Sequence, residues 1–194
     1  MKLLLYGGTF DPPHLGHMNN LEAAIERIRP DKVIVMPAGT PPHKAASATP
    51  GRIRVEMCQC FLPLHPNLEV SGWEIEQGGK SYTIDTILML RAAYPDAELY
   101  LSIGSDMLLS FTTWRRWQEL LQNTALVVQS REPGDGDELA VAADALRGCG
   151  GRIYFAESYT LCVSSSDVRA GLVPWELMPP LVQAVAAQHH LYGR

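Results

Sequence analysis

The fold is decided at the N-terminus by residues 3–17, LLLYGGTFDPPHLGH. An apolar run over residues 3–6 predicts a buried strand, and Gly7–Gly8 then allows a tight turn and the close approach of a ligand to the backbone. Apolar residues next recur every three or four positions, which predicts a helix. His14 and His17 therefore lie where a loop becomes the first turn of this helix. Unpaired N–H groups and the positive end of the helix dipole meet there, so the segment is typical of a phosphate-binding site.

The composition is that of an ordinary globular protein. The chain has 194 residues, of which 46% are hydrophobic and 19% charged. This length favours one domain with a full core. The formal net charge of −5 argues against a nucleic-acid-binding surface, so an anion site must be built from local positive groups. No apolar run approaches the roughly 20 residues of a membrane span, and no signal peptide is recognised, so we expect a cytoplasmic protein with no membrane partner.

The cysteines have neither disulfide nor zinc-ligand spacing, and we interpret them as small buried apolar residues in a reducing compartment. They are Cys58, Cys60, Cys149 and Cys162.

Short apolar runs alternate with helical patterns along the whole chain, without internal repeats or a linker. Strands are expected at residues 3–6, 32–36, 68–75 (with a turn or bulge at 71–72), 98–103, 124–129 and 153–155. This alternation predicts an α/β fold with a doubly wound parallel sheet, which is Rossmann-like. We expect one domain over residues 1–194, with a helical part from about residue 164 packed on it. In such sheets, ligands bind beyond the carboxyl ends of the strands.

Two loops that follow predicted strands place polar groups at this edge. Residues 37–44, PAGTPPHK, bring His43 and Lys44 toward the same crevice as the two histidines. Gly104 and Asp106 follow a later strand. A glycine there lets a ribose approach the backbone, and an acidic side chain can accept hydrogen bonds from the ribose hydroxyls.

Helix starts supply further candidates. Thr49 and Thr83 are predicted to cap helices, the first of which extends to about Leu62. Arg54 lies in that helix; we assign it no chemical role, and an ion pair at the helix surface is at least as consistent with its pattern.

Two more segments suit the binding of a nucleotide. Trp114 lies in FTTWRRW, where the paired arginines indicate the protein surface, so its ring could stack on a flat aromatic ring. Residues 163–169, VSSSDVR, place serine hydroxyls before a helical pattern, which favours a second anion site. Arg169 is predicted in the first turn, against the helix dipole, and is therefore expected to face an added negative charge.

These segments resemble the nucleotidyltransferase superfamily. GGTFDPPHLGH is similar to the HxGH signature, and VSSSDVR to the second signature (I/V)SSTxIR, with Ser166 where threonine is common. The strings PPHK, SYTIDTI, GSD and the tryptophan segment resemble bacterial nicotinate-nucleotide adenylyltransferases, in the same order along the whole chain.

The resemblance implies transfer of AMP from ATP to nicotinate mononucleotide, giving deamido-NAD and pyrophosphate in NAD biosynthesis, with Mg²⁺ as cofactor. It implies catalytic roles for His14, His17, Lys44 and Arg169. It implies ATP binding by Gly7, Gly8, Thr9, Phe10, His17, Gly104, Asp106, Ser165, Ser166 and Arg169. It implies mononucleotide binding by Thr9, Lys44, Thr83 and Trp114. We assign no protein ligand to Mg²⁺, because this ion keeps several waters and binds substrate phosphates.

Other interpretations of the sequence remain open. The chain could be a pantetheine-phosphate adenylyltransferase or a cytidylyltransferase, although these are usually shorter and lack the YTIDT and tryptophan segments. A non-catalytic nucleotide sensor would be expected to have lost a histidine or Arg169. His14 and His17 could merely cap a helix or pack in the core. The sequence leaves open the preference for nicotinate over nicotinamide mononucleotide, and it leaves open the formation of a homo-oligomer.

Overall fold

The computed structural model describes residues 1–40, 47–129, 136–157, 161 and 163–194. Within these residues, six parallel strands form one sheet in the order β3-β2-β1-β4-β5-β6. The strands are β1 (Lys2–Gly8), β2 (Lys32–Pro37), β3 (Leu68–Val70), β4 (Glu98–Gly104), β5 (Ala125–Gln129) and β6 (Ile153–Ala156). This is the strand order of a doubly wound dinucleotide-binding sheet, so the predicted fold class is confirmed.

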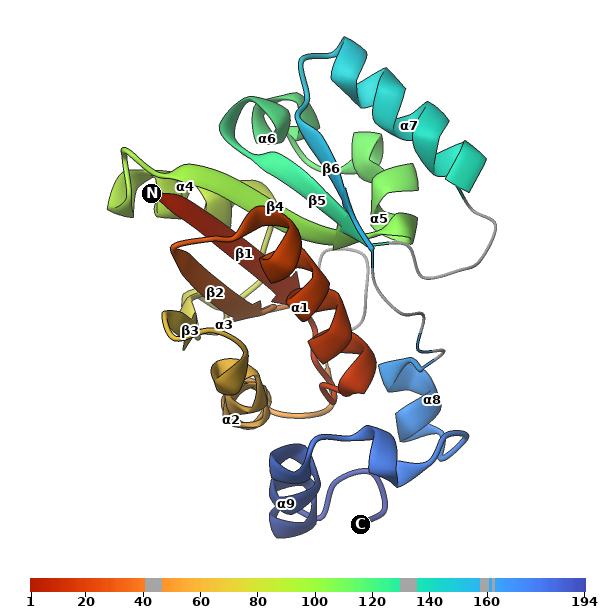
Figure 1. Ribbon diagram of the computed structural model, residues 1–194. Helices are drawn as coiled ribbons and strands as arrows, with labels where there is room; N and C mark the ends of the chain where they lie inside the picture. The colour runs from red at the N-terminus through yellow and green to blue at the C-terminus, as the bar shows by residue number, and fades with distance from the viewer. Residues whose placement is uncertain (41–46, 130–135, 158–160, 162) are drawn as a thin grey trace.

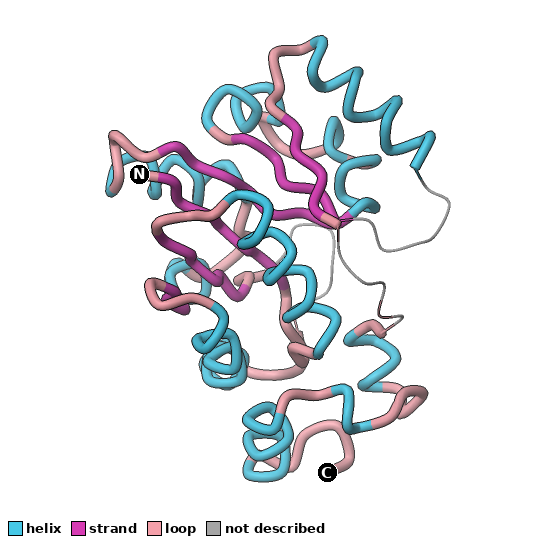
Figure 2. Tube along the Cα trace, viewed as in Figure 1, coloured by secondary structure: helices cyan, strands magenta, loops and turns pink. Residues whose placement is uncertain are grey.

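Helices cover both faces of the sheet (Figures 1 and 2). The α-helices are α1 (Leu15–Ile28), α2 (Gly51–Cys58), α3 (Trp73–Gln77), α4 (Thr83–Ala93), α5 (Ser105–Leu109), α6 (Trp117–Asn123), α7 (Gly136–Gly148), α8 (Ser165–Arg169) and α9 (Pro180–Gln188). Short 3-10 helices are η1 (Gln59–Leu64), η2 (Phe111–Thr113) and η3 (Trp175–Leu177). No helix in the described ranges is both long and apolar enough to cross a membrane.

Alternation along β1 divides the core into two layers. Leu4 and Tyr6 pack with α1, α2 and α9 on one face, while Leu3 and Leu5 pack with α4, α6 and α7 on the other. All four side chains are buried. Because both faces of the strand are covered, its sequence is continuously apolar rather than alternating. The C-terminal residues Val182 and Val185 of α9 belong to the first layer.

The segment that follows β3 differs from its prediction. Residues 73–77 form helix α3 instead of continuing the strand. The amide of Ser71 still donates to the carbonyl of Val35 at 2.9 Å, but the next bond of a parallel ladder would need an amide N–H at Pro37. Proline has no N–H, so the pairing of β3 with β2 ends there.

Two predicted helix caps are also wrong. Pro50 is the N-cap of α2 and Tyr82 the N-cap of α4, and neither side chain makes a capping hydrogen bond. Thr83 is instead the first residue of α4, and Thr49 is buried in a side-chain network described below. Helix α2 ends at Cys58 and continues as 3-10 helix η1, because Pro63 cannot extend α-helical hydrogen bonding.

The cysteines follow their prediction only in part. Cys58 and Cys60 are buried free thiols, and burial raises the pKa of the Cys60 thiol to about 12. Cys149 is exposed, because it follows the last turn of α7 in a glycine-flanked turn. Cys162 lies outside the described residues.

Candidate active site

A cavity of about 300 Å³ opens beside the carboxyl ends of β1 and β4. The two strands are neighbours, but the helix after β1 packs on one face of the sheet and the helices after β4 pack on the other. Such a switch in winding direction leaves a crevice between the strand ends, where doubly wound proteins bind ligands. The cavity therefore lies where the predicted fold places a nucleotide.

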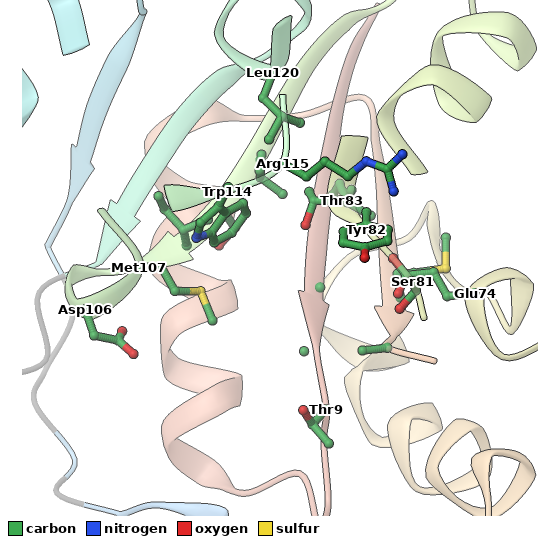
Figure 3. A pocket seen from close by; sticks show the side chains of 18 residues that line it. Thr9, Glu74, Ser81, Tyr82, Thr83, Asp106, Met107, Trp114, Arg115 and Leu120 are labelled. Atoms are coloured by element: carbon green, nitrogen blue, oxygen red, sulfur yellow. The ribbon is translucent and has the colours of Figure 1, made fainter. Parts of the chain in front are cut away.

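The cavity has an apolar floor and a wall that contains aromatic and charged groups (Figure 3). Leu5, Met36, Leu101 and Ile103 supply apolar side chains from three strands. The cavity is also lined by Gly7, Gly8, Thr9, Glu74, Ser81, Tyr82, Thr83, Asp106, Trp114 and Arg115. A largely apolar space with a few polar groups in its lining suits an aromatic ring that carries a polar substituent.

The aromatic wall comes from two loops on the α4–α6 side of the sheet. Trp114 is half-buried and packs against Phe111, with ring centroids 5.2 Å apart. Arg115 lies over the ring of Tyr82 at 4.5 Å, a cation–π contact that fixes its position at the cavity wall. Sequence reasoning identified Trp114 but missed Tyr82 and Arg115, which become neighbours only through the fold.

Glu74 lies beside Ser81 and Tyr82 in the cavity wall (Figure 3). It accepts a hydrogen bond from the buried hydroxyl of Thr86 at 2.6 Å, and a weaker one from the amide of Gly39 at 3.4 Å. The loop after β2 is held to the start of α4 by the amide of Ser81, which donates to the carbonyl of Thr40 at 3.0 Å. These contacts tie the three chain segments of this wall together. The next residues of the loop, including His43 and Lys44, lie outside the described residues.

The end of β1 forms the edge of the cavity next to the histidines. Gly7, Gly8 and Thr9 line the cavity, as predicted for ligand-binding residues. A Cβ added at Gly8 would lie 2.8 Å from the ring of Phe10, so the packing of that ring requires glycine. Phe10 is only 1% exposed and lies among other aromatic rings. Its predicted contact with ATP is therefore limited to its backbone.

His14 and His17 form the start of α1. His14 is the N-cap, and its Nδ1 accepts the amide N–H of His17 at 3.3 Å. The Nδ1 of His17 in turn accepts the amide N–H of His14 at 3.2 Å. The two rings stack with centroids 3.6 Å apart. The histidines thus do cap the helix, and this capping is compatible with a role in phosphate binding.

This reciprocal capping fixes which ring nitrogen holds the proton. Each Nδ1 accepts a backbone N–H and so has no proton of its own, which places the proton of a neutral ring on Nε2. Both histidines are therefore set up as Nε2–H donors at the positive end of α1. Edge-to-face packing of His17 on Phe10, with centroids 5.2 Å apart, further restricts its ring.

Helix α8 lies beside the first turn of α1 (Figure 1). Its N-cap is Ser164, whose hydroxyl accepts the amide N–H of Asp167. Ser165 Oγ donates to the carbonyl of Pro12 at 2.8 Å, and Arg169 Nη1 donates to the carbonyl of Asp11 at 2.5 Å. Two sequence segments that are more than 150 residues apart are thereby joined.

Arg169 was expected in the first turn of its helix, but the structure places it elsewhere. Helix α8 has only five residues, so Arg169 is its last residue and suffers no conflict with the helix dipole. Its Nη2 donates to Ser166 Oγ at 3.1 Å. The guanidinium is exposed and held by two contacts, which directs a planar cation toward the segment that contains the histidines.

Arg54 was missed by sequence reasoning. It is 4% exposed, and its Nη1 donates to the carbonyls of Thr9 at 2.8 Å and Ala38 at 2.7 Å. It is therefore a buried clamp between the loops after β1 and β2, and the expected surface ion pair is wrong. Burial lowers the pKa of its guanidinium, and the nearby carboxylate of Asp11 opposes that shift. No periodic pattern could have revealed this role, because the partners are backbone carbonyls.

The predicted residues form two groups, one in the cavity and one around the start of α1, and the loop after β1 joins them. Thr9, Thr83, Asp106 and Trp114 line the cavity. His14, His17, Ser165, Ser166 and Arg169 lie around the start of α1. Gly104 is buried at the end of β4, where it is the N-cap of α5.

Comparison with known proteins agrees with this geometry. Residues 5–171 match the family model described as cytidylyltransferase-like. The chain belongs to this family. It is 38% identical over 200 residues to a protein of Solibacter usitatus named a probable nicotinate-nucleotide adenylyltransferase, with both chains fully covered. It is also 38% identical over 184 residues to a protein of the same name from Acidithiobacillus ferrooxidans, covering 87% of this chain and 83% of the relative. These relatives place the chain among the nicotinate-nucleotide adenylyltransferases.

Solved structures of two other proteins share the fold. The nicotinic acid mononucleotide adenylyltransferase of Plasmodium falciparum, complexed with NaAD, superimposes with a TM-score of 0.77 at 16% identity. The match covers 99% of this chain and 97% of that one. A structure from Vibrio parahaemolyticus, described as a putative nicotinate-nucleotide adenylyltransferase, gives a TM-score of 0.67 at 18% identity. At these identities the likeness concerns the sheet and its helices.

Proposed function

We propose that the protein is a nicotinate-nucleotide adenylyltransferase, which transfers AMP from ATP to nicotinate mononucleotide and so produces deamido-NAD and pyrophosphate. The observation that supports this best is the adjacency of two unlike sites. A cavity lined by Trp114 and Tyr82 reaches residues 7–9, and two imidazole donors lie with Arg169 around the start of α1, a few residues further along the same loop. One aromatic mononucleotide and one triphosphate can therefore meet at the end of β1.

The chemistry needs positioning more than it needs a base. The phosphate of the mononucleotide is already an oxyanion at neutral pH, and one of its oxygens attacks the α-phosphorus of ATP. The bond from the α-phosphorus to the bridging oxygen of the β-phosphate breaks, and pyrophosphate leaves with the electron pair. The Nε2–H groups of His14 and His17 and the guanidinium of Arg169 stabilise charge on the phosphates during this exchange. Lys44 is proposed to act in the same way, from outside the described residues.

The bases occupy separate places in this proposal. The pyridine ring stacks on Trp114, near Thr83 at the start of α4. The adenosine lies near Gly104 and Asp106, whose carboxylate is exposed beside the cavity. Gly7, Gly8 and Thr9 lie between both nucleotides, and Ser165 and Ser166 contact the outer phosphates. The sharp turn after β1, stabilised by the packing of Phe10, allows this close approach.

We propose that Mg²⁺ enters with ATP. Among the described residues, no group of three His, Cys, Asp or Glu side chains is arranged to hold a metal ion. That fits an ion bound mainly by phosphate oxygens and water, as is usual for Mg²⁺ with nucleotides. Bound to the phosphates of ATP, Mg²⁺ would neutralise part of their charge, while His14, His17 and Arg169 orient the phosphates.

The reaction is tested by measuring pyrophosphate release from ATP and Mg²⁺. Nicotinate mononucleotide, nicotinamide mononucleotide and phosphopantetheine serve as parallel acceptors. We expect rapid release with nicotinate mononucleotide and formation of deamido-NAD, identified by mass. Release only with phosphopantetheine would overturn the acceptor assignment, and no release with any acceptor would instead favour a nucleotide sensor.

Arg115 is expected to favour the nicotinate substrate. It is the single cation among the described residues that line the cavity, and the nicotinate carboxylate adds a negative charge that nicotinamide lacks. Because the side chain is exposed, the effect is screened, and we expect Arg115→Met to lower kcat/KM for nicotinate mononucleotide by about three- to tenfold. The value for nicotinamide mononucleotide should hardly change.

Arg116→Met is the matched control. The adjacent Arg116 pairs with Glu119 through two hydrogen bonds and does not line the cavity. An equal loss for both substrates in Arg115→Met, or the same loss of preference in Arg116→Met, would contradict the assignment.

A further inference from the structure

A buried carboxylate connects the first loop to the C-terminal segment. Asp11, between β1 and α1, is only 3% exposed. One of its oxygens accepts a hydrogen bond from Ser47 Oγ at 2.6 Å, and the other accepts one from the hydroxyl of Tyr192 at 2.5 Å. The Tyr192 hydroxyl also lies 3.2 Å from Thr49 Oγ1. We call these four residues the Asp11 latch.

The hydrogen bonds of the latch have a defined direction. Burial acts to raise the pKa of Asp11, but the hydrogen bonds from Ser47 and Tyr192, together with the positive charge of Arg169, outweigh it and hold the pKa below its ordinary value. The carboxylate is therefore ionised and only accepts. Tyr192 uses its single proton on Asp11, which makes Thr49 the donor to Tyr192. Burial, and then the bond to Asp11, raise the pKa of Tyr192, so its proton remains in place.

The same loop holds helix α8 through its backbone. The carbonyl of Asp11 accepts from Arg169 Nη1, and the carbonyl of the next residue, Pro12, accepts from Ser165 Oγ. These bonds form only when the carbonyls of Asp11 and Pro12 are correctly placed. The side chain of Asp11, held by Ser47 and Tyr192, fixes the position of this loop. Tyr192 is thereby connected to Arg169 through one intervening residue, Asp11.

We propose that Tyr192 is a positioning residue, which acts through Asp11 to hold Arg169 and the α8 serines in place for the triphosphate. The proposal rests on the proposed binding of ATP at this end of the molecule. Tyr192 touches no reacting atom in this scheme. It fixes the loop whose carbonyls orient the groups that do.

The location of the latch predicts which substrate feels its loss. Asp11, Tyr192 and Arg169 are absent from the set of described residues that line the aromatic cavity. Loss of the Tyr192 hydroxyl should therefore disturb the triphosphate and the turnover, while the mononucleotide still binds to an intact wall. A general loss of folded structure would disturb both substrates.

The first experiment is calorimetric binding with Tyr192→Phe. We expect its affinity for ATP to fall by about fivefold to twentyfold, since a hydrogen bond to a charged group is lost. The affinity for nicotinate mononucleotide should stay within twofold, and kcat should fall about tenfold.

Tyr154→Phe is the matched control, because the hydroxyl of Tyr154 has no hydrogen bond among the described residues. This variant should leave both affinities and kcat unchanged. Thermal melts show that both variants are folded at the assay temperature.

A double-mutant cycle with Arg169→Ala tests the connection itself. If Tyr192 acts chiefly through Arg169, the loss of ATP affinity caused by Tyr192→Phe should be much smaller when Arg169 is already alanine, with only the part carried by the α8 serines remaining. Losses that simply add, or an unchanged ATP affinity in Tyr192→Phe, would overturn the proposal. Because binding is measured without turnover, a wild-type protein that binds ATP but transfers nothing would refute the proposed activity and still test the latch. A wild-type protein that does not bind ATP would refute both.

Discussion

Replacing His17 with alanine is expected to lower kcat by at least about 100- to 1000-fold, the usual effect of removing one donor that stabilises charge in a transition state. The reciprocal cap sets the proton of His17 on Nε2 and directs this donor from the first turn of α1. The KM for ATP should change much less than kcat. Single-turnover measurements of pyrophosphate release separate the chemical step from product release.

Two further variants distinguish the donor from the cap. Alanine also removes the acceptor for the His14 amide, which is expected to cost about 1 kcal/mol of helix stability. In His17→Asn, a side-chain oxygen near the position of Nδ1 keeps the cap but the Nε2–H donor is lost, so the protein should be stable and nearly inactive. In His17→Gln, an amide N–H reaches toward the position of Nε2 and should restore part of the rate. Near wild-type turnover in His17→Asn would refute the role.

The arrangement of the sheet and the general place of the site followed from the sequence, because they depend on local patterns. The apolar run that ends in Gly7 and Gly8 marks a strand buried on both faces, and the structure places its end beside the cavity. Thr83 and Trp114 also line that cavity. The place of Thr83 follows from a helix start, which periodicity reveals, whereas Trp114 was identified from the neighbouring arginines and the resemblance to the family.

The supporting contacts could not be predicted in the same way. Arg54 binds the carbonyls of Thr9 and Ala38, and Asp11 binds a tyrosine 181 positions away. Neither interaction has a sequence period, because each depends on loops that meet only after the sheet has formed. The predicted cap at Thr83 failed for a related reason. A threonine before an apolar run satisfies the pattern equally well as N-cap or as first helical residue, and only the backbone decides between them.

Replacing Arg169 with alanine is the second change with a large expected effect. Its guanidinium is fixed by the carbonyl of Asp11 and by Ser166, which leaves the remaining N–H groups to bind phosphate in a preset orientation. We expect kcat/KM for ATP to fall by about 100- to 1000-fold, since both a charge-assisted hydrogen bond and transition-state stabilisation are lost. The KM for nicotinate mononucleotide should remain near its wild-type value.

Arg147→Ala is a closely matched control for this variant. Arg147 likewise contacts a side chain three residues earlier, that of Asp144, and one backbone carbonyl, that of Ile153, but it lies on α7. Its loss removes the same kinds of contact and should leave the kinetics unchanged.

Arg169→Lys keeps the charge but not the planar fork, so it should recover only part of the rate. Full activity in Arg169→Lys would show that charge alone suffices, and full activity in Arg169→Ala would remove α8 from the catalytic site. If Arg169→Ala is nearly inactive and Arg169→Lys regains only part of the rate, then orientation of the guanidinium by the Asp11 carbonyl matters as well as charge.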